Sequence, residues 1–447
     1  MLGVFTRRFL RDRSGNVAII FALSLIPIIL LTGMGLDFSS AADKRIQLNA
    51  AADAAALVVV TPAMMAQSVS QAQTAAQNIF MGQASNVKNL NYSTPTVTIT
   101  QTNGGLTRTV TVNYTAYSVN AFPNVLGQST WPIQGSSSAT STSMPNINFY
   151  LVLDNSPSMN IAATTAGINT MVANTSAQGG CAFACHESNP SADNLGNPNG
   201  EDNYTLAQNL GVVTRIENMA TATAALMFTA QTMENENNVT CPTGPGCYQM
   251  AIYTFNVSGL NTIYAPSNQP SSNLSAAQTA AGNINVLEVC SNNFLTCNNN
   301  NNDTDTNFES AMNAINNIMP TPGNGIGGNS PQEVLFLVTD GVDDEINSNS
   351  CSRPLDGSRC QQPFNTTWCT TIKNRGIRIA VLYTEYLPLP TNSWYNSWIS
   401  PFQSQIATNM QSCASPNLYF QVTTDGDITA AMQQLFQLAV SSARLTQ

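Results

Sequence analysis

Two short polar motifs in the second half of the sequence each follow an apolar run. In the first, the carboxylate of Asp154 is followed two and four residues later by the hydroxyls of Ser156 and Ser158. In the second, Asp340 stands between a threonine and a glycine. Carboxylate and hydroxyl oxygens are hard ligands, and a set with only two carboxylates suits Mg²⁺ or Mn²⁺ better than Ca²⁺, the alternative ion. The pattern predicts a divalent cation site, unless Ser156 simply caps a helix.

Four continuous apolar runs have the length and composition of strands that are buried on both faces. They cover residues 148–154, 248–256, 333–340 and 376–386. Helical patterns alternate with these runs, at residues 215–233, 307–319, 398–412 and 427–444. Alternating strands and helices predict an α/β fold with a doubly wound, mostly parallel sheet. Such sheets bind ligands at the carboxyl ends of their strands, where both motifs fall.

The two motifs, in this order and each after an apolar strand, resemble the metal-ion-dependent adhesion site of the von Willebrand factor A domain, which has a Rossmann-type fold. That family adds a threonine that stands just before a helix, a position that Thr306 fits, with Thr304 as the fallback. The resemblance implies that an acidic group of a protein partner completes the coordination of the metal. It implies these metal ligands: Asp154, Ser156, Ser158, Thr306 and Asp340.

Two further segments lie next to the motifs. Residues 160–209 separate the first motif from its helix, and we expect this insertion to decorate the ligand-binding face and to influence the choice of partner. Asp343, Asp344 and Glu345 follow the second motif and could hold a second calcium ion. Because so short an acidic run is more often solvated, we predict an exposed loop.

An uncharged stretch, residues 17–36, predicts a membrane-spanning helix. Its twenty residues just cross a hydrocarbon core of about 30 Å at 1.5 Å per residue. The tail before it, residues 1–16, carries four arginines and one aspartate, so we expect the tail in the cytoplasm and the rest of the chain exported. A cleavable signal peptide is the alternative, but its apolar region would be shorter. We predict a single-pass protein of a bacterial inner membrane whose bulk is periplasmic or surface-exposed.

The composition divides the rest of the chain. Residues 37–90 are alanine-rich and predict a helical stalk, interrupted at Pro62. Residues 91–135 alternate β-branched and polar side chains, which predicts a β-rich, pilin-like segment. The serine-rich stretch 136–146 predicts a flexible linker to the C-terminal domain, residues 147–447.

A second resemblance concerns the two ends of the chain. The segment GNVAIIFALSLIPIILL and the following GLDFSSAADKRIQLNAAADAAALVVV resemble the start of TadG-like proteins of the Tad (Flp) pilus system. Those proteins join a pilin-like helix to an exported von Willebrand factor A domain. The resemblance implies a membrane-anchored adhesion or assembly factor whose partner is a pilus or cell-envelope component. Prepilins are cut after a glycine with glutamate five residues on, whereas Gly15 is followed by Ile20, so we predict permanent anchoring.

All ten cysteines lie after residue 180, and an even number of closely spaced cysteines predicts disulfides in an oxidising compartment. We expect Cys369 to pair with Cys413, because each precedes one of two adjacent parallel strands. The remaining cysteines are expected to pair with their near neighbours, Cys181 with Cys185, Cys241 with Cys247, Cys290 with Cys297, and Cys351 with Cys360. The spacing of Cys181, Cys185 and His186 is one residue too long for a haem attachment motif.

The charge excludes some classes of function. The formal net charge is −10, and only three basic residues lie between Arg45 and Arg353, which leaves no basic patch for nucleic acid. His186 is the one histidine, which excludes a multi-histidine metal site. A noncatalytic binding protein and a metal-dependent periplasmic hydrolase both fit the metal motifs. Because no paired general acid and base accompanies these motifs, we predict a protein that is not an enzyme.

Overall fold

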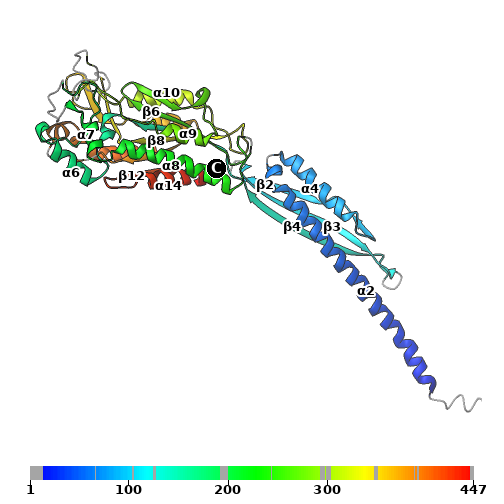
Figure 1. Cartoon of the computed structure of the whole chain (residues 1–447). Coiled ribbons are helices and arrows are strands. Elements are labelled where there is room, and N and C mark those ends of the chain that lie inside the picture. Colours follow the sequence, from blue (N-terminus) through cyan, green and yellow to red (C-terminus); the bar gives the residue numbers. More distant parts are fainter. Residues whose placement is uncertain are drawn as a thin grey trace, which may run out of the picture. The chain divides into compact units, whose positions relative to one another are not determined.

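The computed structural model describes residues 14–65, 67–102, 105–123, 127–191, 200–242, 244–291, 297, 304–346, 351–386, 388–389 and 392–442. The chain forms two compact units, Met1–Ser143 and Met144–Gln447, whose elements are labelled in Figure 1. Most of the predicted cytoplasmic tail lies outside the described residues.

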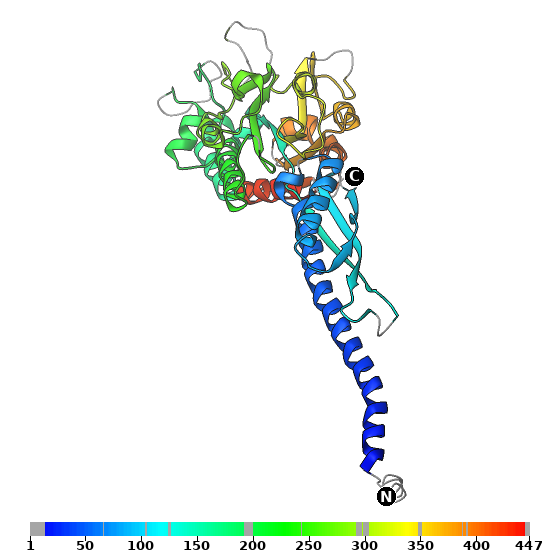
Figure 2. The same ribbon diagram turned by 90° about the vertical axis from the view of Figure 1, so that its right-hand side faces the viewer.

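The described part of the N-terminal unit contains three helices and a four-stranded antiparallel sheet. Its elements are α2 (Ser14–Val59), α3 (Pro62–Met65), α4 (Val69–Ala84), β1 (Leu90–Tyr92), β2 (Thr96–Thr102), β3 (Thr107–Val119) and β4 (Thr130–Thr142). Strand β3 is central and pairs with the other three. Figure 2 shows the second half of α2 lying along this sheet. The predicted break at Pro62 is confirmed, since α2 ends at Val59.

The first part of α2 is apolar and exposed, whereas the second part is buried against the unit's own core. The apolar stretch has a mean hydropathy of 2.6 and is long enough to cross a membrane. Pro27 lies inside the helix without ending it. Farther along, α2 contributes small side chains such as Ala52 and Ala55 to a core shared with Phe80 of α4 and Val110 of β3. The expected stalk is therefore a helix packed on a sheet.

The predicted flexible linker at residues 136–146 is wrong for most of its length, because residues up to Thr142 belong to β4. This half of β4 pairs with β3 through the backbone, and hydroxyl groups face one another across the two strands. Thr107 lies 3.1 Å from Thr142, Thr109 lies 3.0 Å from Thr140, and Thr111 lies 2.9 Å from Ser138, oxygen to oxygen. Cross-strand hydroxyl pairs let a serine-rich segment form a strand with one solvated face.

The C-terminal unit contains a six-stranded sheet and a separate two-stranded one. The strands of the large sheet are β5 (Ile147–Asp154), β6 (Tyr248–Asn256), β7 (Gly259–Tyr264), β8 (Gln332–Thr339), β11 (Arg378–Thr384) and β12 (Tyr419–Val422), and those of the small sheet are β9 (Val342–Ile346) and β10 (Arg359–Pro363). The helices are α6 (Thr165–Asn174), α7 (Asn203–Asn209), α8 (Arg215–Glu236), α9 (Leu274–Ala281), α10 (Phe308–Ile318), α11 (Thr367–Asn374), α12 (Ser393–Trp398), α13 (Gln403–Cys413) and α14 (Ile428–Ser442). Short 3-10 turns join some of them, among them η2 (Pro157–Asn160).

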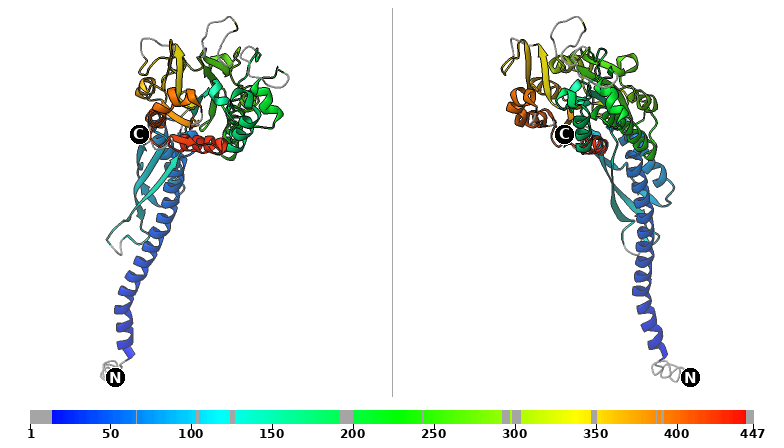
Figure 3. Two further views of the ribbon diagram at one scale, coloured as in Figure 1. Left: turned by 90° about the vertical axis from the view of Figure 1, so that its left-hand side faces the viewer. Right: turned by 60° about the vertical axis from the view of Figure 1, so that its left-hand side comes forward.

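The large sheet is covered by helices on both faces, so the predicted α/β class and mostly parallel sheet are confirmed. Alternate residues of β5 enter two different cores: Phe149 packs with α8, α9 and α14, and Tyr150 packs with α10, α11 and α13. Figure 3 shows α14 lying next to α8. Only the edge strand β7 is antiparallel.

The order of the strands fixes where a ligand would bind. Along the sheet the order is β12-β11-β8-β5-β6-β7, so the chain runs outward from β5 to one edge and then returns to continue from β8 on the other side. Strands β5 and β8 are parallel neighbours. The order therefore reverses between them, and open sheets of this kind bind ligands in the crevice at that switch point.

Four of the predicted disulfides are confirmed. They are Cys241–Cys247, Cys290–Cys297, Cys351–Cys360 and Cys369–Cys413. The fifth predicted pair is wrong, because no disulfide bond joins Cys181 to Cys185. The segment between them places Phe183 in a backbone bridge with Ile161.

Candidate metal centre

The first half of the site is a tight loop at the end of β5. The carboxylate of Asp154 accepts two hydrogen bonds at Oδ1, from the amide of Ser156 at 3.0 Å and from its hydroxyl at 2.6 Å. Oδ2 accepts a third from the hydroxyl of Thr339 at 2.6 Å. The Ser156 hydroxyl makes no capping hydrogen bond to the 3-10 turn η2 that follows it. Ser156 therefore stands at the N-cap position of η2, but its side chain does not act as the cap.

The second half of the site follows β8. Asp340 comes directly after the last residue of that strand, and one of its oxygens, Oδ1, accepts a hydrogen bond from the amide of Val342 at 3.3 Å. The Ser158 hydroxyl faces the same carboxylate. The other oxygen, Oδ2, is buried and has no hydrogen-bond partner among the described residues. A buried carboxylate oxygen without a partner is costly, and an ion is one way to satisfy it.

Both carboxylates are buried, and burial dominates their electrostatics. Burial raises the pKa of Asp154, while the hydrogen bonds from Ser156 and Thr339 oppose the rise. Burial, followed by repulsion from Asp154, raises the pKa of Asp340 as well. The raised pKa values mean that ionising both carboxyl groups is unfavourable. A divalent cation would stabilise the site, because it favours the charged form of each carboxyl group.

The expected location of the motifs at the ends of strands is confirmed, but the side chains are less accessible than a strand end suggests. Asp154 and Ser156 are 0% exposed and Asp340 is 1% exposed. Ile161 pairs with Phe183 of the insertion, and these two residues line a small gap together with Asp340.

Thr306 belongs to a loop before α10. Its backbone exchanges two hydrogen bonds with Asp344 of β9, each 2.9 Å long. Helix α10 begins two residues later and is capped by Asn307. Thr306 lines the same cavity as Ser158, whereas the fallback residue, Thr304, is buried and does not line it.

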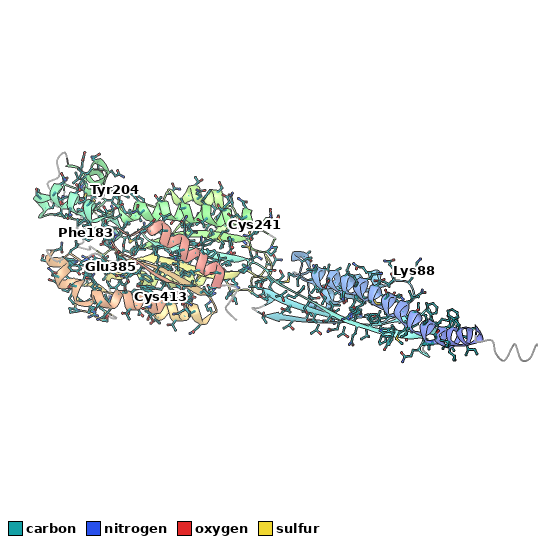
Figure 4. All side chains as sticks on the ribbon, turned by 90° about the horizontal axis from the view of Figure 1, so that it is seen from below. Lys88, Phe183, Tyr204, Cys241, Glu385 and Cys413 are labelled. Carbon is teal, nitrogen blue, oxygen red and sulfur yellow. A yellow bond between two sulfur atoms is a disulfide. The ribbon has the colours of Figure 1, made fainter. Side chains whose placement is uncertain are left out.

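The cavity opens next to these hydroxyls and has a volume of about 600 Å³. The insertion contributes one wall, with Phe183. The small sheet contributes another, with Arg359 and Gln361, and Tyr386 and Trp394 add aromatic surface. Figure 4 labels Phe183 at the end of the C-terminal unit that holds the carboxyl ends of the strands, and Cys241 at the other end.

The predicted exposed loop of Asp343, Asp344 and Glu345 is wrong, because these residues form the buried strand β9. Arg359 of β10 pairs with Asp344 through two nitrogens, Nε at 2.7 Å and Nη2 at 2.5 Å. The amide of Phe308 donates a hydrogen bond to Asp343 at 3.0 Å. The acidic run is thus held by an arginine and by the start of α10, partners that lie too far along the chain to be inferred from the run itself.

Two residues of the site were not predicted from the sequence. Thr339 directly precedes Asp340 and anchors Asp154, so the threonine of the second motif was an available signal. Arg215, at the start of α8, lines a closed gap together with Ser158 and Asp340. The one sequence signal for Arg215 was that basic residues are rare in this part of the chain.

The described oxygen atoms fit a small divalent cation. The hydroxyl of Ser156 donates its proton to Asp154, and the hydroxyl of Ser158 faces Asp340. The two hydroxyl oxygens lie 3.0 Å apart. Because the Ser156 hydroxyl gives its one proton to Asp154, it accepts the hydrogen bond from the Ser158 hydroxyl, and each oxygen keeps a lone pair for a cation.

Comparison with known proteins gives one family match. Residues 15–67 match the family described as "Putative Flp pilus-assembly TadE/G-like". The search of curated proteins gives no match. Among solved structures, the chain is similar to proximal thread matrix protein 1 from the mussel byssus, with 12% identity over 68% of this chain and 46% of that one. The TM-score is 0.28, too low to establish a shared fold for the two chains. The similarity to TadE/G-like proteins of Flp pilus assembly therefore concerns residues 15–67 of the chain.

Proposed function

We propose that this protein is a membrane-anchored, exported adhesion or assembly factor of a Tad-type pilus, and that its C-terminal unit is a von Willebrand factor A-like domain that binds a partner's carboxylate through a metal ion. The TadE/G-like match at residues 15–67 supports the pilus system. The apolar first part of α2 and the four disulfides support an anchored protein whose bulk lies outside the cytoplasm.

One observation carries the metal-dependent part of the proposal. Oδ2 of Asp340 is buried without a hydrogen-bond partner among the described residues, and the fully buried carboxylate of Asp154 lies near enough to raise its pKa. Proteins rarely bury two acids together without a compensating charge. The pair occurs at the switch point of the sheet, where such folds bind ligands.

The ligand set assigns a role to each residue. Ser156, Ser158 and Thr306 would contact the ion through their hydroxyls, and Asp154 and Asp340 would do so directly or through water. A set with two carboxylates suits Mg²⁺ or Mn²⁺. The bound ion supplies an electrophilic centre that an acidic group of the partner can join from the cavity.

Binding fits this site better than hydrolysis. His186 is the one imidazole of the chain; its Nδ1 lies 2.8 Å from the carboxylate of Asp202, and it is not among the residues that line the cavity. A hydrolase would need a group beside the metal that exchanges protons with the substrate. The carboxylates next to the metal are already engaged as ligands in this proposal.

The proposal is tested by metal binding to the full chain in detergent. Wild type should bind one Mn²⁺, measured by calorimetry, and Asp154→Asn and Asp340→Asn should each weaken binding at least about a hundredfold, because each loses one charged ligand. Asp356→Asn is a matched control, since Asp356 is exposed at the rim of the same cavity and is not a ligand. Its affinity should stay within about twofold of wild type.

The adhesion part needs a second measurement. Wild-type protein, cross-linked in the cell envelope, should capture pilus or envelope proteins in Mg²⁺ and lose them in EDTA. Asp340→Asn should lose them in both conditions while its circular dichroism matches wild type. Equal capture by the folded variant in EDTA would mean that the metal site has no part in adhesion.

A further inference from the structure

Arg215 is a buried cation placed beside the two acids. It is the first residue of α8, and its amide donates a hydrogen bond to the carbonyl of Ile161 at 3.0 Å. The preceding residue, Thr214, pairs with Ala162 and forms a capping box with Glu217. The backbone at the start of α8 is therefore tied to the end of the Asp154 loop, and this fixes the position from which the arginine side chain starts.

The side chain of Arg215 is directed at the site. It is 4% exposed and lines a small closed gap with Ser158 and Asp340. Among the described residues, its side chain donates one long hydrogen bond, to the hydroxyl of Thr424 at 3.5 Å. A guanidinium has five donors, so one long bond satisfies little of its capacity. Burial lowers the pKa of Arg215, and the carboxylates of Asp340 and Glu385 oppose that shift.

We propose that Arg215 is the internal counter-charge of the Asp154–Asp340 pair, that it limits the affinity of the site for a divalent cation, and that it makes the loaded site select an anionic ligand. This inference rests on the metal site of the proposed function. Arg215 does not bind the ion itself, and it acts on the ion through the electric field of its charge. It is therefore a positioning and specificity residue.

The charges explain both effects. Without a metal ion, the two carboxylates and Arg215 sum to −1, so the arginine lowers the cost of burying the acids. With a divalent cation, the same groups sum to +1, so the arginine repels the ion that its neighbours attract. A site with a residual positive charge favours a carboxylate ligand over a neutral one. Affinity for the metal is thereby reduced while preference for an acidic partner is increased.

The test is a gain of metal affinity. Arg215→Met in the full chain should bind Mn²⁺ about tenfold more tightly than wild type or better, because a repelling charge is removed from a buried site. Arg215→Lys keeps the charge and should stay within about threefold of wild type. Arg378→Met is a matched control, since Arg378 starts β11 at the amino ends of the strands and bonds to Ala439 there, and it should leave the affinity unchanged.

The ligand preference is tested with acetate as the probe. Acetate that joins the bound Mn²⁺ displaces water, and the enhancement of water-proton relaxation falls. Arg215→Met should require about tenfold more acetate than wild type for the same decrease. Equal acetate dependence in the two proteins would overturn the claim that Arg215 selects an anionic ligand.

The outcomes separate this inference from the function on which it rests. If wild type binds no Mn²⁺, the proposed metal site fails. If wild type binds Mn²⁺ and Arg215→Met binds it equally or more weakly, the metal site stands and the role of Arg215 is refuted. Loss of a purely structural arginine could lower the affinity for Mn²⁺ but could not raise it.

Instability of the variant does not remove the test. Should Arg215→Met unfold in EDTA, the double variant with Asp340→Asn should regain stability, since the arginine no longer has an acid to balance. A double variant that is no more stable than Arg215→Met would refute the counter-charge role.

Discussion

Asp154 and Asp340 are both buried, but their surroundings prepare them for different roles. Asp154 has both oxygens occupied by hydrogen bonds from Ser156 and Thr339, so its orientation is fixed. Asp340 keeps one oxygen without a partner among the described residues. At the residue scale, Asp154 therefore organises the loop, and Asp340 is the group with the most to gain from a bound ion.

Another buried acid, Glu333, lies at the other end of the strands and gives a prediction that is independent of any metal. It is 2% exposed, and burial raises its pKa from 4.5 to about 8 despite a hydrogen bond from the amide of Asn148 at 3.1 Å. Because the folded protein holds this proton more tightly than the unfolded chain, stability should fall as the pH rises from about 4.5 to about 8.

Glu333→Gln should remove the part of that fall that comes from Glu333 and make the protein about 4 kcal/mol more stable than wild type at pH 8. The measurement is denaturant unfolding at several pH values, followed by tryptophan fluorescence. Glu309→Gln, an exposed position in the first turn of α10, is the control and should leave the pH profile of wild type unchanged. A profile for Glu333→Gln as steep as that of wild type would contradict the assignment.

The residues of the candidate site differ in whether the sequence next to them is enough to predict their role. Asp154, Ser156 and Ser158 form one short motif, and Asp340 closes an apolar strand, so these four could be predicted from the sequence. Arg215 could not, because its position depends on the pairing of Ala162 with Thr214 across the whole insertion. Long-range pairing of this kind leaves no periodic pattern in the sequence.

At the scale of elements, the Cys369–Cys413 disulfide joins α11 to the end of α13 on one face of the large sheet. The two cysteines are 44 residues apart in the sequence, and both are fully buried. Cys351–Cys360 closes a shorter loop of the same unit, with a separation of 9. Because a longer loop loses more chain entropy on closure, the first bond should stabilise the fold more than the second.

Replacing both Cys369 and Cys413 by alanine should lower the free energy of unfolding by about 4 kcal/mol, against about 3 kcal/mol for Cys351 and Cys360 replaced together. Denaturant unfolding of the two double variants measures the difference. Three of the four tryptophans, Trp368, Trp394 and Trp398, report on this unit. A larger decrease in the free energy of unfolding for the Cys351 and Cys360 variant would show that loop length does not decide the difference. Residual structure in one of the unfolded chains is one such cause.

The central elements of the C-terminal unit could be predicted because their patterns are strong. Strands β5, β6, β8 and β11 are buried on both faces and appear as continuous apolar runs. The small sheet was missed because β9 and β10 carry charged and amide side chains that are satisfied by one another. The end of β4 was missed because its serines resemble a linker, and only their pairing with threonines of β3 makes them a strand.

At the scale of the whole molecule, the chain forms two units with separate cores, and the first of them contains the apolar part of α2. The N-terminal unit is the one that contains the TadE/G-like match, and the C-terminal unit contains the candidate metal centre and all four disulfides. Disulfides of this kind form in oxidising compartments. The four disulfides therefore indicate the compartment of the C-terminal unit independently of the arginines in the tail.

Alkaline phosphatase fused after Gln447 should be active, because that enzyme also needs an oxidising compartment for its disulfides. The tail carries Arg7, Arg8, Arg11 and Arg13 before the apolar stretch, and the positive side of such a helix stays in the cytoplasm. β-Galactosidase at the same fusion point should be inactive. Replacing the four arginines by glutamate should lower phosphatase activity several-fold, because the helix loses the charge asymmetry that orients it. A phosphatase fusion that is inactive in an intact, membrane-inserted protein would place the C-terminal unit in the cytoplasm, where neither the disulfides nor an envelope partner could be accounted for.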